Sequence, residues 1–371
     1  TWIGSWGTAM RRLSAVFLFL VLATGQAQGQ ACVDYDSSTR VIADEILPLN
    51  AGEVVVQGGY AYTACPDYDE PYGLMVLDIS DPAAPELVGT GGTYWLNSGF
   101  GRISPGLDVA GDLVYLLSDA GIEIVDVQDP TAPVGRGVEG LTDPRTIAVI
   151  GDDAFIADNA DGFVVLDVAN PDAPSVVTTL PLGSSAFDLV TQGDYAYVVS
   201  VDSLFVIDIS TPASPFVTGS LFVSGGSQRC LTVSGNTVYL GQWSPNAGLF
   251  AVDVSNPAAP SHLGDIIVNY PTGIEIQGTT AYVAGEYGRL LVIDVSNPAA
   301  MDEVYRIDAN GRQIALDGSH IFMGSSNAQP RFKTIVLGVN DTPNSNGAYT
   351  QLPSARYIRV GSGAAHVIGV E

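Results

Sequence analysis

Four arginines stand at equivalent places in a repeating pattern of this sequence. We aligned the repeating units by the glycine that ends their first apolar stretch, with Ser362 replacing glycine in the last unit. The residue six positions earlier is an arginine in four of the eight units: Arg145, Arg229, Arg312 and Arg356. A guanidinium group offers a planar fork of donors that suits a carboxylate or a phosphate. These arginines predict an anion-binding site, and ion pairing between neighbouring units is the structural alternative.

A second recurring residue is an aspartate at the end of near-identical strings such as LMVLDISDPAAP and FVVLDVANPDAP. Six copies are separated by 41 to 48 residues: Asp78, Asp126, Asp167, Asp208, Asp253 and Asp294. One active site does not need six equivalent carboxylates. We therefore interpret them as structural acceptors, bonded to amides of the following Ser/Asn-Pro turn or to a neighbouring unit.

Other chemistry has less support in the sequence. Two oxygen-rich segments suit Ca²⁺, although neither has the spacing of an EF-hand loop, and solvated turns are the alternative. Their candidate ligands are Asp67, Asp69, Glu70 and Asp341. The three histidines are scattered and no G-x-S-x-G motif is present, so we assign no catalytic residue. No cofactor is firmly implied.

The elements around these residues are short strands. Upstream of each aspartate string, an alternating apolar stretch ends in Gly and is followed by an apolar-aromatic stretch, as in residues 146–157. Runs of β-branched and aromatic residues bounded by Gly, Asn, Asp and Pro predict strands and tight turns. Each unit then holds four antiparallel strands, as in TIAVIG, AFIAD, FVVLDV and SVVTTL. Four-stranded sheets repeated every 40 to 50 residues predict an all-β propeller.

The number of blades depends on the two ends of the array. Residues 332–340 resemble a seventh copy of the aspartate-bearing strand, with Gly338 in place of Asp, and residues 356–361 and 364–370 resemble the first two strands of an eighth unit. Residues 40–49 resemble a lone fourth strand. Because closure removes exposed sheet edges, we predict that this strand completes the last blade. The prediction is eight blades with the last incomplete, and seven blades with a C-terminal hairpin is the alternative.

The N-terminal segment predicts export. Arg11 and Arg12 precede a short apolar core and small residues, which is the pattern of a secretory signal within residues 1–31. Residues 32–371 then form a single propeller domain. An exported protein can keep a disulfide, and Cys32 with Cys65 is a possible pair. Cys32 would also follow a cut after Ala31, which leaves a lipoprotein as an alternative, and Cys230 is expected to be a buried thiol.

Charge restricts the partners. The chain carries a net charge of −26, and the signal segment contributes two arginines and no acid. A surface this acidic repels nucleic acid. No further apolar run is long enough to span a bilayer. We expect a monomer in the periplasm, outside the cell or on its surface, with a protein, a glycan or a small anion as its partner.

The repeated string G-L-x-V-[IL]-D-[IV]-S-[DN]-P-x-x-P resembles the LVIVD repeat of bacterial secreted and surface proteins, including those of the choice-of-anchor B type. The resemblance covers residues 41–370 and implies an extracellular propeller module without assigned catalytic residues. We therefore predict a binding scaffold. A secreted hydrolase or lyase with a site at the channel mouth is the alternative, which converging carboxylates and arginines would favour. A third reading is a structural array anchored by a region beyond residue 371.

Overall fold

The computed structural model describes residues 40–49, 51–65, 73–92, 106–118, 121–223, 228–243, 247–285, 288–309, 311–325, 331–337, 355–361 and 364–369. For residues 40, 228–229, 355–361 and 364–369 only the backbone is described. Within these ranges no helix has the length and apolar character that crossing a membrane would require.

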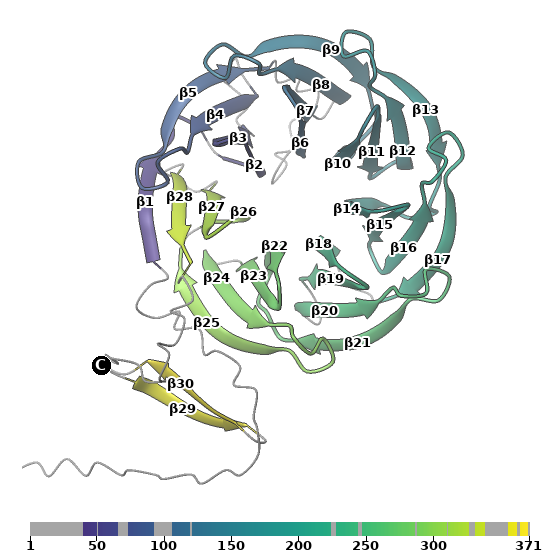
Figure 1. Ribbon diagram of the computed structural model, residues 1–371. Coiled ribbons are helices and arrows are strands. Elements are labelled where there is room, and N and C mark those ends of the chain that lie inside the picture. Colours follow the sequence, from purple (N-terminus) through teal and green to yellow (C-terminus); the bar gives the residue numbers. More distant parts are fainter. Residues whose placement is uncertain are drawn as a thin grey trace, which may run out of the picture.

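The described residues form seven four-stranded antiparallel sheets arranged as blades around a central axis (Figure 1). Blade 1 contains β2 (Val54–Gln57), β3 (Tyr60–Ala64), β4 (Leu74–Asp78) and β5 (Glu86–Gly91). Blade 2 contains β6 (Leu107–Ala110), β7 (Leu113–Ser118), β8 (Gly121–Asp126) and β9 (Val134–Gly140). Blade 3 contains β10 (Pro144–Ile150), β11 (Asp153–Asp158), β12 (Gly162–Asp167) and β13 (Ser175–Leu180).

The remaining blades continue the same order around the ring. Blade 4 contains β14 (Ala186–Gln192), β15 (Tyr195–Ser200), β16 (Ser203–Asp208) and β17 (Phe216–Phe222). Blade 5 contains β18 (Gln228–Ser234), β19 (Thr237–Gln242), β20 (Gly248–Asp253) and β21 (Ser261–Ile266). Blade 6 contains β22 (Pro271–Gln277), β23 (Thr280–Gly285), β24 (Arg289–Asp294) and β25 (Asp302–Asp308). In each blade the first strand lies at the axis and the fourth at the rim (Figure 1).

Blade 7 joins the two ends of the array. It contains β26 (Gln313–Asp317), β27 (His320–Ser325), β28 (Arg331–Val336) and, as its outer strand, β1 (Arg40–Ile46). β1 pairs antiparallel with β28 from Arg40↔Val336 to Ile46↔Arg331. Asp44 of β1 forms ion pairs with Arg331 at 3.1 Å and Lys333 at 3.3 Å, which support this register.

The structure therefore has the seven blades of the alternative prediction, and the eight-blade arrangement is not found in the described residues. The N-terminal strand does complete the last blade, but it adds to β28 rather than to an eighth unit. β29 (Ala355–Gly361) and β30 (Ala364–Gly369) form a separate two-stranded sheet. No room is left for another blade, because blades 7 and 1 pack directly on each other through Ala315, Phe322 and Met75.

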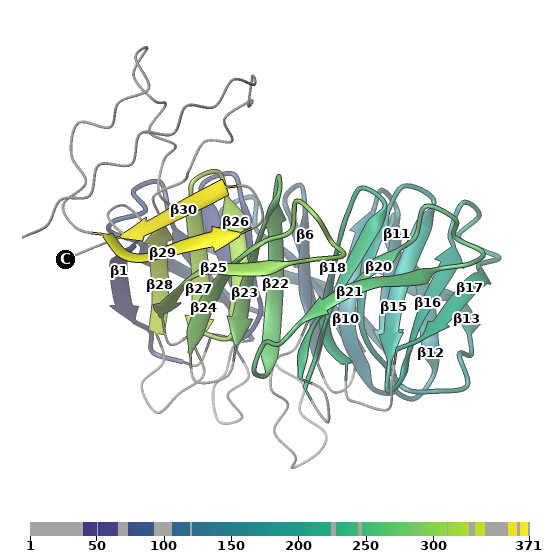
Figure 2. The ribbon, with the colours of Figure 1, turned by 90° about the horizontal axis from the view of Figure 1, so that it is seen from below.

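The core is divided among the blade interfaces. Seven clusters of buried apolar side chains each combine residues from two neighbouring blades, so every interface of the closed ring has one. Turned by 90°, the ring is a disc whose height is set by the strand length (Figure 2). Because burial of apolar surface is the main stabilising contribution, the ring is held by blade-to-blade packing.

The repeated string explains how the outer parts of neighbouring blades fit. In blades 2, 3, 5 and 6, the proline turn after the third strand packs on a glycine in the fourth strand of the preceding blade. At Gly137 in β9, a Cβ atom would lie 2.5 Å from the carbonyl oxygen of Pro171 in the blade 3 turn, while its N–H donates to that oxygen at 2.8 Å. The glycine leaves room for the proline turn, so the Pro of one unit depends on the Gly of another.

Candidate functional site

The inner strands of the seven blades surround an axial cavity of about 430 Å³. Its volume falls in the range of small-molecule sites, about 300–1,000 Å³. Side chains of a strand alternate between its two faces. The residues five and three positions before the turn glycine of each inner strand therefore share the cavity side of that strand.

Four carboxylates occupy these positions and line the cavity. Glu53 and Asp188 stand five residues before their glycines, and Asp108 and Glu275 stand three residues before theirs. All four side chains are partly exposed to the cavity although they lie deep in the ring. The cavity is thus acidic, and the sequence reading, which followed only the sixth position, did not identify these residues.

Three of these carboxylates accept backbone N–H groups from the inner strand of the next blade. Glu53 Oε2 accepts from Leu107 N at 3.3 Å. Asp108 Oδ2 accepts from Val149 N at 2.7 Å, and Asp188 Oδ2 accepts from Leu231 N at 2.9 Å. The other oxygen of each aspartate accepts from the following residue of its own strand, at 2.7 Å for Asp108 and 2.9 Å for Asp188. These side chains tie neighbouring inner strands together, and we call this arrangement the carboxylate clasp.

The electrostatics of the cavity favour protonated carboxyl groups. Burial raises the pKa of Glu53 to about 8, and repulsion from Asp188 adds to this increase. Burial raises the pKa of Asp188 to about 7, although hydrogen bonds from Thr146, Leu231 and Leu189 oppose the shift. The pKa of Asp108 is also raised by burial. Acids with a raised pKa exchange protons closer to neutral pH than ordinary carboxylates do.

Glu275 differs from the other three carboxylates. Its side chain makes no hydrogen bond or ion pair with any described residue. Burial alone raises its pKa to about 7. An acid that has no donor among the described residues and faces a cavity of ligand size is a candidate for contact with a bound molecule.

Two of the four predicted arginines line this cavity. Arg145 Nη2 lies 3.1 Å from Asp143 Oδ2, which also accepts a hydrogen bond from Asn159 at 2.6 Å. Arg312 makes no side-chain hydrogen bond or ion pair within the described part of the chain. The backbone of Arg229 lies in β18, but the structure does not describe its side chain. Arg356 belongs to β29, which is not part of the ring.

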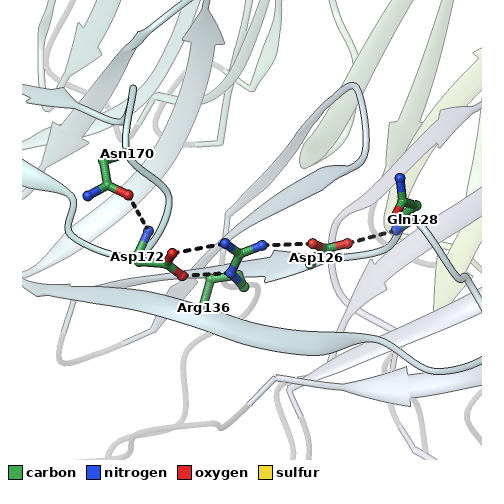
Figure 3. Close-up of polar contacts among 5 residues, drawn as sticks. All are labelled: Asp126, Gln128, Arg136, Asn170 and Asp172. Carbon is green, nitrogen blue, oxygen red and sulfur yellow. Dashed lines mark hydrogen bonds and ion pairs between the residues drawn. The ribbon is translucent and has the colours of Figure 1, made fainter.

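The pairing between blades that was the alternative for these arginines occurs elsewhere, at Arg136 in β9 (Figure 3). Its guanidinium donates to both carboxylate oxygens of Asp172 in the blade 3 turn, at 2.6 and 2.9 Å. It also donates to Asp126 of its own blade at 2.9 Å. The ion pair raises the pKa of Arg136 and lowers that of Asp172. An outer-rim arginine, which the sequence reading did not single out, thus joins blades 2 and 3.

The six repeated aspartates accept backbone hydrogen bonds in the turns that follow them. Each ends the third strand of its blade, and its Oδ1 accepts the backbone N–H two residues later at 2.8–3.0 Å. In five blades the Asp or Asn three residues on repeats this contact at 3.0–3.3 Å. The two side chains shape the turn that reaches the preceding blade, which accounts for the conserved spacing within the repeat.

The other predicted sites remain predictions. Asp67, Asp69, Glu70 and Asp341 lie outside the described residues, and the described residues contain no cluster of metal-ligating side chains. Cys32 also lies outside them, so its pairing with the buried Cys65 is untested. Cys230 is a buried free thiol, as predicted, and burial raises its pKa.

The fold is shared with solved propellers of low sequence similarity. The WD40 domain of Neurospora crassa Pan2 is 13% identical, with a TM-score of 0.60 over 81% of this chain and 97% of that chain. Saccharomyces cerevisiae Sqt1 is 11% identical, with a TM-score of 0.55 over 83% and 89%. The computationally designed Ika8 protein is 10% identical, with a TM-score of 0.53 over 83% and 100%. These likenesses establish the fold alone.

Sequence comparison identifies the repeat itself. No curated protein matches the chain. The LVIVD repeat model matches residues 50–93, 101–137, 143–180, 183–222, 225–266 and 270–309. These segments include the four strands of blades 1 to 6, except the last three residues of β9, with the clasp carboxylates and the repeated aspartates. The chain therefore belongs to the LVIVD-repeat family.

Proposed function

We propose that this chain is an exported binding scaffold that holds an anionic group of its ligand at the mouth of the axial cavity. The mouth is the end of the cavity where the inner strands begin, and Arg312 is its main recognition residue. A guanidinium that makes no hydrogen bond or ion pair with a described residue, next to a cavity of ligand size, is the observation that carries the proposal.

The charge balance of the chain supports this assignment. The protein has 40 acidic and 14 basic residues, so a cationic group at the cavity is a local exception. Of the two arginines whose described side chains line the cavity, Arg145 is paired with Asp143, and Arg312 has its charge available to a ligand. Export follows from the signal-like residues 1–31, and the bacterial origin and choice-of-anchor type implied by the resemblance stay predictions.

Binding of small anions tests the proposal. Isothermal titration of the full chain with acetate, phosphate and citrate should show binding of at least one anion, which weakens about tenfold in Arg312→Gln. Arg289→Gln, which removes the same charge from the exposed outer part of blade 6, is the matched control and should bind normally. The proposal is wrong if no anion binds, or if both variants weaken binding equally.

A hydrolase or lyase is the second candidate, because carboxylates and an arginine do converge on one cavity. A group with a pKa of about 7, as for Glu275, is suited to general acid–base catalysis near neutral pH. The scaffold ranks first because three of the four carboxylates already bind backbone amides, and glycoside hydrolysis requires two acting carboxyl groups. Turnover of a glycan substrate by the wild type that is lost in Glu275→Gln would reverse this order.

A further inference from the structure

Three polar side chains without a partner among the described residues lie on two neighbouring blades of the cavity wall, next to an indole of a third blade. We call this part of the wall the open sector; it is built by blades 5, 6 and 7 and consists of Trp243, Glu275, Arg312 and Gln313. The side chains of Glu275, Arg312 and Gln313 make no hydrogen bond or ion pair with another described residue. Three adjacent groups of this kind indicate a surface prepared for a polar ligand rather than one that completes the fold.

The aromatic member of the open sector is held in place from behind. Trp243 Nε1 donates to the carbonyl oxygen of Pro271 at 2.7 Å, and the Tyr270 ring meets the indole edge-on with centroids 5.8 Å apart. Tyr270 has a φ of 50°, and it is the one non-glycine residue in the described part of the chain with a positive φ. A strained backbone is typical of ligand clamps, where the surrounding structure holds it. The indole is thus a fixed, partly exposed apolar surface at the mouth.

The backbone around the sector also leaves space for Gln313. A Cβ atom on Gly273 would lie 2.9 Å from Gln313 Oε1, so only glycine fits at this position without moving the amide. The hydroxyl of Thr272 donates to the carbonyl oxygen of Arg312 at 2.6 Å and fixes the start of the blade 7 inner strand. The Thr272 bond positions the backbone at Arg312, and neither contact uses a side-chain hydrogen bond of Arg312 or Gln313.

The polar groups occupy different depths. Arg312 stands six residues before its turn glycine, Gln313 five, and Glu275 of the neighbouring strand three. At about 3.3 Å per residue, the levels of Arg312 and Glu275 differ by about 10 Å along the axis. A ligand that contacts both needs an anionic group at one end, hydroxyl or amide groups toward the other, and an apolar face for the indole.

We propose that the open sector binds a uronic acid at the end of a glycan, with the sugar carboxylate on Arg312, the apolar face of the ring on Trp243, and hydroxyl groups on Gln313 and Glu275. This assignment rests on the proposed function, since Arg312 must first hold an anion. A single guanidinium matches the single charge of a carboxylate bidentately. A nucleotide or a polyanion fits less well, because Arg312 offers a single positive charge and each neighbouring carboxyl group that ionises repels additional negative charge.

Titration with matched sugars tests the proposal. Methyl glucuronide should bind the full chain at least about tenfold more tightly than methyl glucoside, which lacks the charge, and than acetate, which lacks the ring. Arg312→Gln should abolish the preference for the uronide. Trp243→Ala should weaken binding of both sugars. Arg289→Gln, with its side chain on the outer part of blade 6, should change neither affinity.

The outcomes separate the two proposals. If acetate or phosphate binds through Arg312 but the uronide gains nothing over acetate, the sugar assignment is wrong and the anion site stands. If no probe binds, both are wrong. Tighter binding of a nucleotide than of the uronide also overturns the sugar assignment. Thermal melting of each variant checks folding, and Arg312→Lys, which keeps the charge without the planar fork, should bind with intermediate affinity.

Discussion

The carboxylate clasp and the open sector are two parts of one cavity wall with different uses of similar residues. Asp108 and Glu275 stand at the same position of their inner strands, yet only Asp108 binds the next blade. The shorter side chain of Asp108 also accepts the N–H of the following residue, which holds its carboxylate against the strand. Glu275 has one more methylene group and makes no such bond. At this position of the inner strand, the shorter side chain ties two blades together and the longer one faces the cavity. Glu53, which stands two residues further from its turn glycine, reaches the next blade with the longer side chain.

Loss of a clasp aspartate should have the largest effect on stability. Asp188→Ala removes the acceptor of Leu231 N and Leu189 N, and each unsatisfied amide costs about 1–3 kcal/mol. Release of repulsion with Glu53 offsets part of this loss. We expect a net decrease of about 2 kcal/mol in the free energy of unfolding, measured by urea denaturation with tryptophan fluorescence.

Glu275→Gln is the matched variant in the open sector. It removes a buried charge that has no donor among the described residues, so its free energy of unfolding should equal or exceed that of the wild type. Equal destabilisation by the two variants would show that the clasp and the open sector do not differ as described.

The pH dependence of stability should be the next largest effect. Burial raises the pKa of Glu53 from 4.5 to about 8, of Asp188 from 3.8 to about 7 and of Glu275 from 4.5 to about 7. Across this interval the folded chain keeps protons that the unfolded chain has released. The free energy of unfolding therefore falls as pH rises from the lower toward the higher values. Tm, measured by calorimetry, should be higher at about pH 5 than at about pH 8.

The same experiment on Glu275→Gln shows how much of this dependence comes from the open sector. The variant has no titrating carboxyl group at position 275, so only Glu53 and Asp188 contribute to the shift. Its Tm should therefore decrease less between the two pH values than that of the wild type. A wild-type Tm that is constant or rises over this interval would contradict the raised pKa values of the cavity.

The smallest expected effect on stability comes from replacing Glu275 in blade 6 by aspartate, the residue type that blade 2 has at the equivalent position, Asp108. Glu275→Asp should allow the carboxylate to accept the N–H of Ile276 and of the facing residue in β26, as Asp108 does in its blade. We expect a gain of about 1 kcal/mol in the free energy of unfolding, because a new hydrogen bond forms. The sugar carboxylate should still bind Arg312, while the contact between the side chain at position 275 and the sugar hydroxyl groups is lost. A decrease in stability would show that side-chain length does not explain the difference.

Much of this architecture could be predicted from the sequence because it repeats. The strand boundaries, the propeller and the role of the six aspartates follow from local patterns that each unit carries in full. The closure of the ring does not, since the pairing of β1 with β28 depends on how many blades fill the circle. Residues 356–370 have strand-like sequences, which led to the prediction of an eighth blade, but the buried contact between blades 7 and 1 closes the ring without them.

The cavity was harder to predict than the fold. Arg145 and Arg312 were found through a repeated position, but the same alignment could not show that Asp143 neutralises one and not the other. The four carboxylates stand at two different positions and occur in only four of the seven inner strands, so no single repeat position reveals them. Their partners belong to the next blade, and sequence spacing within a unit contains no information about that register.

The pairing of Arg40 with Val336 places the beginning of β1 and the end of β28 side by side. Both lie at the edge of the disc where the inner strands end, opposite the mouth that carries Arg312. Any tether joined to either end of the array, whether a lipid, a wall-sorting segment or a stalk, would hang from this one side of blade 7. A molecule fastened in that way would present its mouth outward, toward whatever arrives from the surroundings.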